Sequence, residues 1–456
     1  MKKTIYMIAL LALIGLSNIA NAQSIAGGRA FSLAVCENST VRSWGYNVNG
    51  QLGNGTNTDS NVPTEVTGMT DARAVSCGDR HSLCLRNDGT VWAWGDNGNG
   101  ALGNGTNISS NVPVAVATLT DVTAVAAGRY HSMALMADGT VRAWGNNSEG
   151  ELGNGTTTHS NVPLPVGFLT EVVAISAGTN FSLALRADGT VWAWGINDDG
   201  QLGNGSNTSS LVPVQVSLLT GISAISGGYF HTLALKEDGT VWAWGSNENG
   251  QLGTGNYIGS NVPLQVAGLT DVIKIAGGRS HSLVLRDDGI IWSWGRNHAG
   301  QLGNGNFTNS TVPVQVSSLT DMGAIAAGEV HSLARRNDGS GWSWGNNTNG
   351  ELGIGTNTAS NIPVQITTLC PVLAIGDPAE RTAVSVFPNP SDGRFTVSLA
   401  AGEGSVEVYN TVGQRVYQSA IRNPQSAIDL SGFPEGIYIA RISSEGRTVT
   451  VKIVIR

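Results

Sequence analysis

A Trp-Gly pair recurs every 50 residues along most of this 456-residue chain, and this period constrains the fold more than any other feature. The pairs begin at Trp44, Trp94, Trp144, Trp194, Trp244, Trp294 and Trp344. Self-similarity at a fixed period of this size is typical of repeat architectures such as solenoids and propellers. The chain therefore contains seven copies of one unit.

Each copy predicts four short strands and no helix. In the copy around Trp144, a small-residue strand covers 124–128, a second strand opens at His131, and a third ends at Trp144. A fourth apolar stretch lies near Pro165 to Leu169, after a long loop rich in Asn and Gly. These runs have the length and turn signals of strands and lack a helical period. We therefore expect an all-β fold.

The copies must pack on one another, because a four-stranded unit of this size cannot bury both of its faces alone. An open solenoid and a closed ring both satisfy this need. Closure removes exposed strand edges, which an exported all-β protein must protect. A strand at 24–28 opens the first copy and a similar stretch follows the seventh at 371–376, so we expect one of them to complete a blade begun at the other end.

The repeated motifs resemble a known family. They read Ala-Gly-x-x-His-Ser-Leu-x-Leu, then Asp-Gly-Thr-Val-x-x-Trp-Gly, then Asn-x-x-Gly-Gln-Leu-Gly-Asn-Gly. Their order is similar to that of the regulator-of-chromosome-condensation repeat, whose members form seven-bladed β-propellers. The resemblance implies one such propeller over residues 23–376.

Both ends of the chain carry signs of export. Lys2 and Lys3, an apolar run over 5–16 and Ala20-Asn21-Ala22 predict a signal peptide over residues 1–22. An uncleaved anchor is the alternative, although the run is shorter than the roughly 18 to 20 residues that span a bilayer. We expect no membrane span elsewhere.

The period stops after residue 376, where a polar linker over 377–383 precedes alternating strand patterns over 384–456. These patterns predict a small C-terminal β-sandwich. The tail also resembles the C-terminal sorting domain of type IX secretion in Bacteroidetes. The matching residues are Val386-Phe387-Pro388-Asn389-Pro390, Gly393, Phe395, Tyr409-Asn410, Gly413, Leu430, Pro434, Gly436, Tyr438 and Lys452. This resemblance implies a partner in the type IX machinery and a product that is secreted or held at the cell surface. An ordinary adhesive sandwich is the alternative.

Composition argues against nucleic acid and anionic membranes as partners. Charged residues make up only 13% of the chain and the formal net charge is −8. Lysine occurs only at positions 2, 3, 236, 274 and 452, so no basic stripe can form. Polyanion binding depends on such stripes.

No set of residues indicates catalysis, and we expect neither an enzyme nor a metal or cofactor. Five copies place a histidine at one position: His81, His131, His231, His281 and His331. A metal ion on the central axis would need bonds of roughly 2.0 to 2.1 Å to several histidines. Equivalent atoms of different blades in a sevenfold ring are too far apart to reach one ion at that distance. Each Asp-Gly pair is read as a hairpin turn rather than a general acid. The Gly-x-Gly strings precede no helix and so are not phosphate loops.

Binding residues are expected where copies differ while the frame stays fixed. The two residues before each histidine position vary in this way and include many arginines and aromatic residues, which are common at interface hot spots. We predict a binding surface at Arg29, Arg80, Arg129, Tyr130, Tyr229, Phe230 and Arg279. If this surface fails, the Asn/Gly-rich loops, taken to lie on the other side, are the alternative. Ordinary turn residues are the competing interpretation.

These features favour an exported, monomeric binding or adhesion module for an unidentified protein or glycan. An inhibitor of a secreted enzyme, which the repeat family includes, is one alternative, and a hydrolase or lyase on a propeller scaffold is another. Guanine-nucleotide exchange, the best-known activity of the family, conflicts with export, which removes the protein from cytosolic GTP.

Four cysteines in an exported chain are expected to form disulfides. Four cysteines allow three connectivities, which sequence does not decide. We favour Cys36 with Cys370, which would seal the ring, and Cys77 with Cys84, which would staple adjacent strands.

Overall fold

The fold is taken from a computed structural model that describes residues 24–366, 368–370, 384–387, 391–399, 403–410, 414–423, 425–444 and 447–455. They form two compact units, with the division after Cys370. Every regular element assigned within these residues is a β-strand, so the predicted all-β class is confirmed. The predicted signal peptide and the linker over 377–383 lie outside the described residues.

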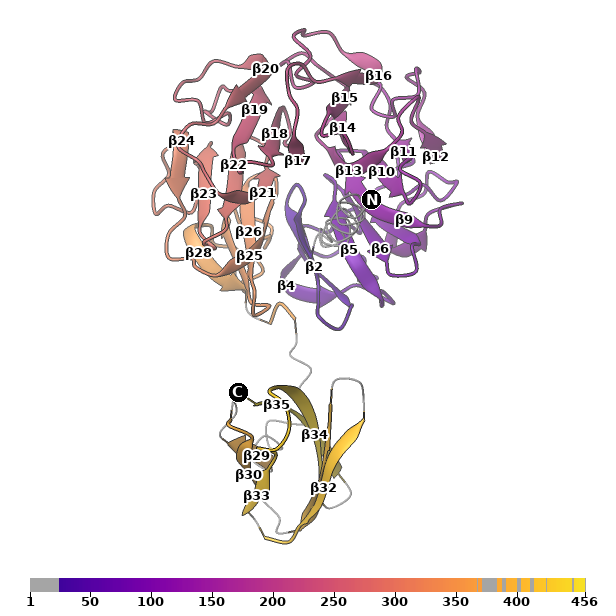
Figure 1. The fold of residues 1–456 in the computed structure, drawn as a ribbon. Helices are drawn as coiled ribbons and strands as arrows, with labels where there is room; N and C mark the ends of the chain where they lie inside the picture. Colours follow the sequence, from indigo (N-terminus) through magenta and orange to yellow (C-terminus); the bar gives the residue numbers. More distant parts are fainter. Residues whose placement is uncertain are drawn as a thin grey trace, which may run out of the picture. The chain divides into compact units, whose positions relative to one another are not determined.

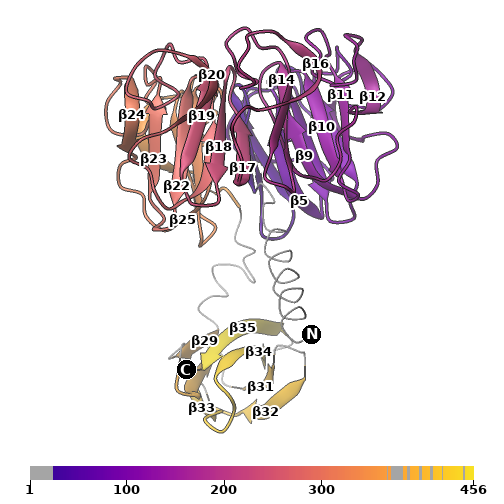
Figure 2. The same cartoon turned by 45° about the horizontal axis from the view of Figure 1, so that its top comes forward.

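Seven four-stranded antiparallel sheets make up the first unit and surround a central channel, as Figure 1 shows. Each sheet is one blade built from four consecutive strands, and we number the blades 1 to 7 in chain order. The predicted seven-bladed propeller is therefore confirmed. Figure 2 shows the blades from the side, with the strands of each blade running between the two faces of the ring.

The strands keep the same order in every blade, from the channel outward. The innermost strands are β1 (Ile25–Gly27), β5 (Ala72–Cys77), β9 (Val122–Ala127), β13 (Val172–Ala177), β17 (Ile222–Gly227), β21 (Val272–Gly277) and β25 (Met322–Ala327). The second strands are β2 (Phe31–Val35), β6 (His81–Arg86), β10 (His131–Met136), β14 (Phe181–Arg186), β18 (His231–Lys236), β22 (His281–Arg286) and β26 (His331–Arg336). The third strands are β3 (Val41–Gly45), β7 (Val91–Gly95), β11 (Val141–Gly145), β15 (Val191–Gly195), β19 (Val241–Gly245), β23 (Ile291–Gly295) and β27 (Gly341–Gly345). The outermost strands are β4 (Ser60–Glu65), β8 (Ser110–Ala115), β12 (Ser160–Pro165), β16 (Ser210–Gln215), β20 (Ser260–Gln265), β24 (Ser310–Gln315) and β28 (Ser360–Ile366).

The expected position of the fourth strand was wrong. In blade 3 this strand begins at Ser160, whereas the sequence pattern suggested Pro165 to Leu169. Val166 and Leu169 are buried, but they lie in the turn that follows the strand and close the core of the blade. Their burial produced the apolar pattern without strand structure.

Adjacent blades are joined by a polar arrangement built around the invariant tryptophan. All seven of these tryptophan side chains are fully buried. In blade 3, Nε1 of Trp144 donates a hydrogen bond to the carbonyl of Ala101 in blade 2 at 2.9 Å, and the Ser132 hydroxyl donates to the same carbonyl at 2.9 Å. The other six junctions repeat this arrangement. The tryptophan position is therefore fixed by hydrogen bonding as well as by packing.

The ring closes through the same contacts that join the other blades. Strand β1 packs against β25 and β26, and Nε1 of Trp44 donates to the carbonyl of Glu351 at 2.8 Å. Within the part of the chain that is described, every blade is one continuous segment, so no strand exchange is seen. The stretch 371–376, expected to complete a blade, lies outside that part.

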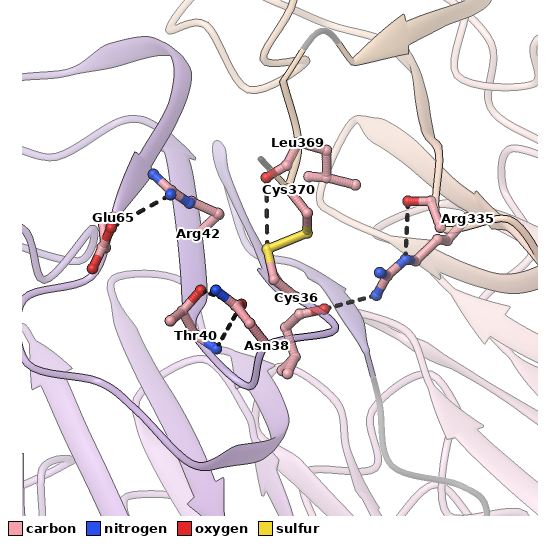
Figure 3. Close-up of a disulfide and its surroundings, with 10 residues drawn as sticks. Cys36, Asn38, Thr40, Arg42, Glu65, Arg335, Leu369 and Cys370 are labelled. Carbon is pink, nitrogen blue, oxygen red and sulfur yellow. Dashed lines mark hydrogen bonds and ion pairs between the residues drawn. A yellow bond between two sulfur atoms is a disulfide. The ribbon is translucent and has the colours of Figure 1, made fainter. Parts of the chain in front are cut away.

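A disulfide between Cys36 and Cys370 links blade 1 to the end of blade 7, as expected (Figure 3). The two Cα atoms are 5.5 Å apart. Arg335 of blade 7 crosses the same seam, and its Nη1 donates to the carbonyl of Val35 at 2.7 Å. The first and last blades are thus joined covalently and by hydrogen bonds.

The expected Cys77–Cys84 disulfide was wrong, because both cysteines are free thiols. In the hairpin of β5 and β6, Cys77 lies opposite Ser82 and Cys84 lies opposite Val75. The two cysteines are therefore diagonal neighbours, and such Cα atoms are roughly 7 to 8 Å apart. A disulfide requires a shorter Cα separation.

The second unit contains two sheets, with strand orders β29-β30-β33 and β32-β31-β34-β35. Its strands are β29 (Val384–Phe387), β30 (Arg394–Leu399), β31 (Gly404–Tyr409), β32 (Arg415–Ile421), β33 (Gln425–Asp429), β34 (Gly436–Ser444) and β35 (Arg447–Ile455). Residues from both sheets form one apolar core that includes Phe395, Val408 and Ile442. The predicted C-terminal sandwich is confirmed.

Candidate functional site

The variable residue pairs and the Asn/Gly-rich loops lie on the same face of the propeller. The N–H of Asp96, at the start of one long loop, donates to the carbonyl of Arg80 at 2.8 Å. The same bond joins Asn146 to Tyr130 in the next blade. We call this the loop face, and we call the opposite end, which carries the Asp-Gly turns, the hairpin face. The expectation that the two features lie on opposite sides was wrong, because the third strand returns the chain to the end where the second began.

A buried asparagine fixes the shape of each long loop. In blade 1, Nδ2 of Asn47 donates to the carbonyls of Thr56 and Thr58 at 3.0 Å, and its Oδ1 accepts from the N–H of Leu52 at 2.9 Å. The equivalent residues are Asn97, Asn147, Asn197, Asn247, Asn297 and Asn347, all at most 1% exposed. Asn stands at this position in all seven copies, so repeat comparison could have revealed its structural role. The loops are internally braced rather than free to adapt.

At the loop face, seven residues surround the end of the central channel, and we call them the mouth ring. They are Arg29, Asp79, Arg129, Thr179, Tyr229, Arg279 and Glu329, one from each blade in the same repeat position. All but Arg279 line the central cavity, and Arg279 contacts Glu329 beside it. Backbone bonds run from blade to blade around this ring, for example from the N–H of Asp79 to the carbonyl of Arg129 at 3.2 Å and from the N–H of Arg129 to the carbonyl of Thr179 at 3.1 Å. The ring is therefore a rigid frame for its side chains.

The mouth ring buries two carboxylates beneath three arginines. Asp79 is 5% exposed and Glu329 is 8% exposed. Nε of Arg129 lies 3.2 Å from Oδ2 of Asp79, and Nε of Arg29 lies 3.1 Å from Oε2 of Glu329, which Arg279 also contacts. The arginine side chains are 41 to 45% exposed. The paired acids thus hold guanidinium groups whose other edges face solvent.

Tyr229 reaches across the channel from blade 5 to blade 2. Its hydroxyl donates to Oδ1 of Asp79 at 2.5 Å, and the Arg279 guanidinium lies 5.6 Å from the centre of its ring. Burial and the nearby Asp79 carboxylate raise the pKa of Tyr229 above its ordinary value, so the hydroxyl stays protonated. Burial also raises the pKa of Asp79, while Tyr229 and Arg129 oppose that shift.

The structure places the seven predicted binding residues in two groups. Four of them, Arg29, Arg129, Tyr229 and Arg279, belong to the mouth ring and have partners within the protein. Arg80, Tyr130 and Phe230 each follow a mouth-ring residue and are partly exposed. The Arg129 guanidinium lies 5.1 Å from the Tyr130 ring centre, and the rings of Tyr229 and Phe230 meet edge to face with their centres 6.1 Å apart.

Sequence reasoning missed the two acids of the mouth ring. Asp79 and Glu329 occupy the same repeat position as the predicted arginines. Opposite charges at one position in a closed ring could have indicated ion pairs between blades. Only the structure shows which arginine meets which acid.

The repeated histidines serve the blade junctions. Nε2 of His131 lies 3.0 Å from the Ser182 hydroxyl of the next blade, and the other four histidines make the same contact. Within the described segments, no group of three or more His, Cys, Asp or Glu side chains is placed to hold a metal ion. The same segments contain no helix that is long and apolar enough to cross a membrane.

Comparison with protein families gives four matches, three in the propeller and one in the C-terminal unit. Residues 69–385 match the RCC1-like domain, and residues 22–51 and 40–85 match single regulator of chromosome condensation (RCC1) repeats. Residues 385–456 match the secretion system C-terminal sorting domain. No curated protein matches the chain.

Solved structures with similar folds are also propellers of this kind. Human WBSCR16 is 26% identical over 72% of this chain and 94% of its own, with a TM-score of 0.65. Yeast RCC1 (Prp20), solved with Kap60 bound, is 24% identical over 83% of this chain and 92% of its own, with a TM-score of 0.66. Prp20p from Saccharomyces cerevisiae, whose structure was reported with its binding properties to Gsp1p and histones, is 24% identical over 81% of this chain and 92% of its own, with a TM-score of 0.66.

Proposed function

The chain belongs to the RCC1-like domain family, and we propose that it is a binding module whose loop face holds a protein or glycan partner. Its C-terminal sorting domain directs it to secretion or attachment at the cell surface through the type IX machinery. A partner is therefore sought outside the cell. The mouth ring and its three neighbours Arg80, Tyr130 and Phe230 form the proposed contact surface.

The observation that carries this proposal is a rigid ring that presents arginine and aromatic side chains to solvent. Arg29, Arg129 and Arg279 are each more than 40% exposed although each touches a buried acid. Because these contacts restrict the side chains before binding, a partner would lose less conformational entropy in ordering them. Arginine and tyrosine are also enriched at interface hot spots.

Both acids in the ring already have partners, which supports a binding role over a catalytic one. A general base needs a free acceptor within reach of the proton it removes. Asp79 accepts from Tyr229 and pairs with Arg129, and Glu329 pairs with Arg29 and Arg279. These carboxylates are better suited to holding cations in place.

Paired affinity capture tests the proposal. One bait is the secreted chain, and the second carries Arg80→Ala, Tyr130→Ala and Phe230→Ala, which spare the buried ion pairs of the ring. A third bait carries Val173→Ala, an exposed residue of the inner strand β13, as a control outside this surface. Material from the native environment is passed over each bait and analysed for proteins and glycans. We expect a ligand retained by the first and third baits and lost from the second; equal retention by all three would contradict the proposal.

A further inference from the structure

One blade breaks the repeat by placing a lysine on the wall of the central channel. One repeat position at the inner strand is small in the six other blades: it is Ser24, just before β1, and Ala74, Ala124, Ala174, Ala224 and Ala324, each the third residue of its strand. In β21 it is Lys274, which lines the central cavity of about 320 Å³ and is partly buried. No ion pair joins Lys274 to a carboxylate in the part of the chain that the structure describes.

The Lys274 ammonium group lacks the oppositely charged partner that buried charges usually have. Burial lowers the pKa of Lys274 from its ordinary value. Along the chain, Asp271 lies three residues before Lys274 at the hairpin face, where it pairs with Arg286. The acids of the mouth ring lie five residues further on, about 16 Å along an extended strand. Asp79 and Glu329 are also already paired there. A charge in a cavity without a counter-ion is costly, so Lys274 favours an anionic ligand.

The other polar side chains of the cavity also offer hydrogen-bond donors. The hydroxyl oxygens of Ser76, Ser176 and Ser226 each accept from a backbone N–H of the next blade at 3.0 Å. Those bonds leave the hydroxyl hydrogens unused, since none of them donates to another group among the described residues. The three serines line the cavity with Lys274.

Thr179 is an independent sign of a missing ligand. It is 4% exposed, it lines the same cavity near the loop face, and its Oγ1 has no hydrogen-bond partner in the described structure. Buried hydroxyl groups nearly always have a partner, because leaving one unsatisfied costs about 1 to 3 kcal/mol. A ligand that extends along the channel would supply an acceptor.

We propose that the central channel binds a carboxylate ligand, with the Lys274 ammonium as its counter-ion and channel hydroxyls as hydrogen-bond donors. Lys274 and the serines lie inside the channel, away from the loop-face surface, and only Thr179 belongs also to the mouth ring. The inference does not depend on the function proposed above. The carboxylate belongs either to a small free acid or to the C-terminus of an extended peptide. These two sources share the same recognition chemistry.

Calorimetric titration of the full chain tests this site at constant ionic strength. The free-acid probes are acetate and succinate, and the peptide probes are tetra-alanine with a free or an amidated C-terminus. The variant Lys274→Met keeps the aliphatic stem and removes the charge. The matched control is Lys236→Met, because Lys236 lies on β18 and pairs with Asp238 on the surface. Thr179→Val removes the unpaired hydroxyl without changing the side-chain shape.

We expect saturable binding of at least one carboxylate probe, weakened about tenfold or more by Lys274→Met and unchanged by Lys236→Met. Binding of the free acids indicates a small-molecule ligand, and binding of only the free-ended peptide indicates a chain terminus. Thr179→Val is expected to weaken binding of the free-ended peptide, which can extend along the channel to the loop face, and to leave binding of acetate and succinate unchanged. Absence of saturable binding by every probe would overturn the proposal, and so would equal affinity in the chain with Lys274→Met. Equal binding of the amidated peptide would also overturn it.

Discussion

Five buried histidines act as neutral hydrogen-bond donors at the blade junctions. The hydroxyl next to each ring donates to a backbone carbonyl, as Ser332 does to Gln301, so the histidine Nε2 must supply the proton between them. Burial lowers the pKa of His81, His231 and His331 to about 4 and that of His131 and His281 to about 3. The unfolded chain, with histidine pKa values near 6.5, therefore binds more protons than the folded chain in this range. Their contribution to stability is complete above about pH 6.5 and is lost as pH falls toward 4.

The first prediction uses the phenylalanines that two blades already carry at this position, Phe31 and Phe181. His281→Phe removes one group whose pKa differs between the folded and unfolded states. The slope of unfolding free energy against pH near pH 5 should fall by about 1.4 kcal/mol per pH unit, which corresponds to one proton. Urea denaturation at several pH values between 4.5 and 7.5 measures it. An unchanged slope would mean that His281 is not buried as a neutral group.

At the residue scale, the sequence predicted which positions are structural but not what they bind. The alternation of His with Phe indicated an apolar, non-ligand site, and the structure places both residue types in full burial. The bond from Tyr229 to Asp79 could not be predicted, because it joins residues 150 positions apart across the channel. Whether the Tyr229 hydroxyl can reach Asp79 depends on the diameter of the channel, which the repeat pattern does not encode.

The turns between blades hold two bulky residues in a conformation that favours glycine. Phe168 has φ 55° and Leu218 has φ 57°, and both side chains are fully exposed. At the same repeat position, blades elsewhere use Gly68 and Gly268 with φ 67° and 78°. A left-handed conformation strains residues with a Cβ atom. These two turns therefore store strain that no packing offsets.

The second prediction is that Phe168→Gly stabilises the propeller. Relief of the left-handed strain should raise the free energy of unfolding by about 1 kcal/mol, because the exposed ring makes no packing contribution that would be lost. Phe307→Gly is the matched control, since Phe307 is an exposed aromatic residue outside the positive-φ set. Thermal unfolding of both variants measures the difference. A loss of stability in Phe168→Gly equal to that of the control would rule out strain at this turn.

At the scale of elements, the sequence predicted strand number and order better than strand position. The three inner strands of each blade follow the expected pattern, because alternating apolar residues there face neighbouring blades. The outermost strand contains few buried residues, and in β12 none is fully buried. The alternation of apolar and polar residues is therefore weak in the outermost strand. The strand was predicted at the apolar turn residues Val166 and Leu169 instead, because these two are buried.

The whole propeller depends on a seam between blades 1 and 7, and the third prediction concerns its disulfide. In the chain-entropy model, Cys36–Cys370 closes a loop of 334 residues. Replacing both cysteines with alanine should lower the free energy of unfolding by up to about 6 kcal/mol, and residual structure in the unfolded chain makes the loss smaller. Cys84→Ala is the control, because most blades carry alanine at that position, and it should cost about 1 kcal/mol.

Peptide mapping of unreduced protein accompanies this measurement. It should show Cys36 joined to Cys370, with Cys84 alkylated only after unfolding and Cys77, which is partly exposed on the channel wall, alkylated slowly in the folded chain. Burial raises the pKa of both free thiols, that of Cys84 to about 12, which slows their reaction in the folded state. A Cys77–Cys84 bond, or equal stability losses in the two variants, would contradict this account of the seam.

The fourth prediction separates the two units of the chain. Deleting residues 384–456 removes the sorting domain but leaves all seven blades, so a folded propeller should accumulate in the periplasm of the native host. Fractionation and protease resistance report its location and folding. Arrival of the shortened chain outside the cell would show that the propeller carries its own export information.

We propose that the partner contacts the loop face rather than the hairpin face, and hydrogen exchange of the captured complex distinguishes the two faces. Amides at 29–30, 79–80, 129–130, 229–230 and 279–280 should exchange more slowly when the partner is bound. The Asp-Gly turns of the hairpin face, such as Asp138-Gly139, should exchange at the same rate with and without it. Protection confined to the hairpin turns would contradict the claim.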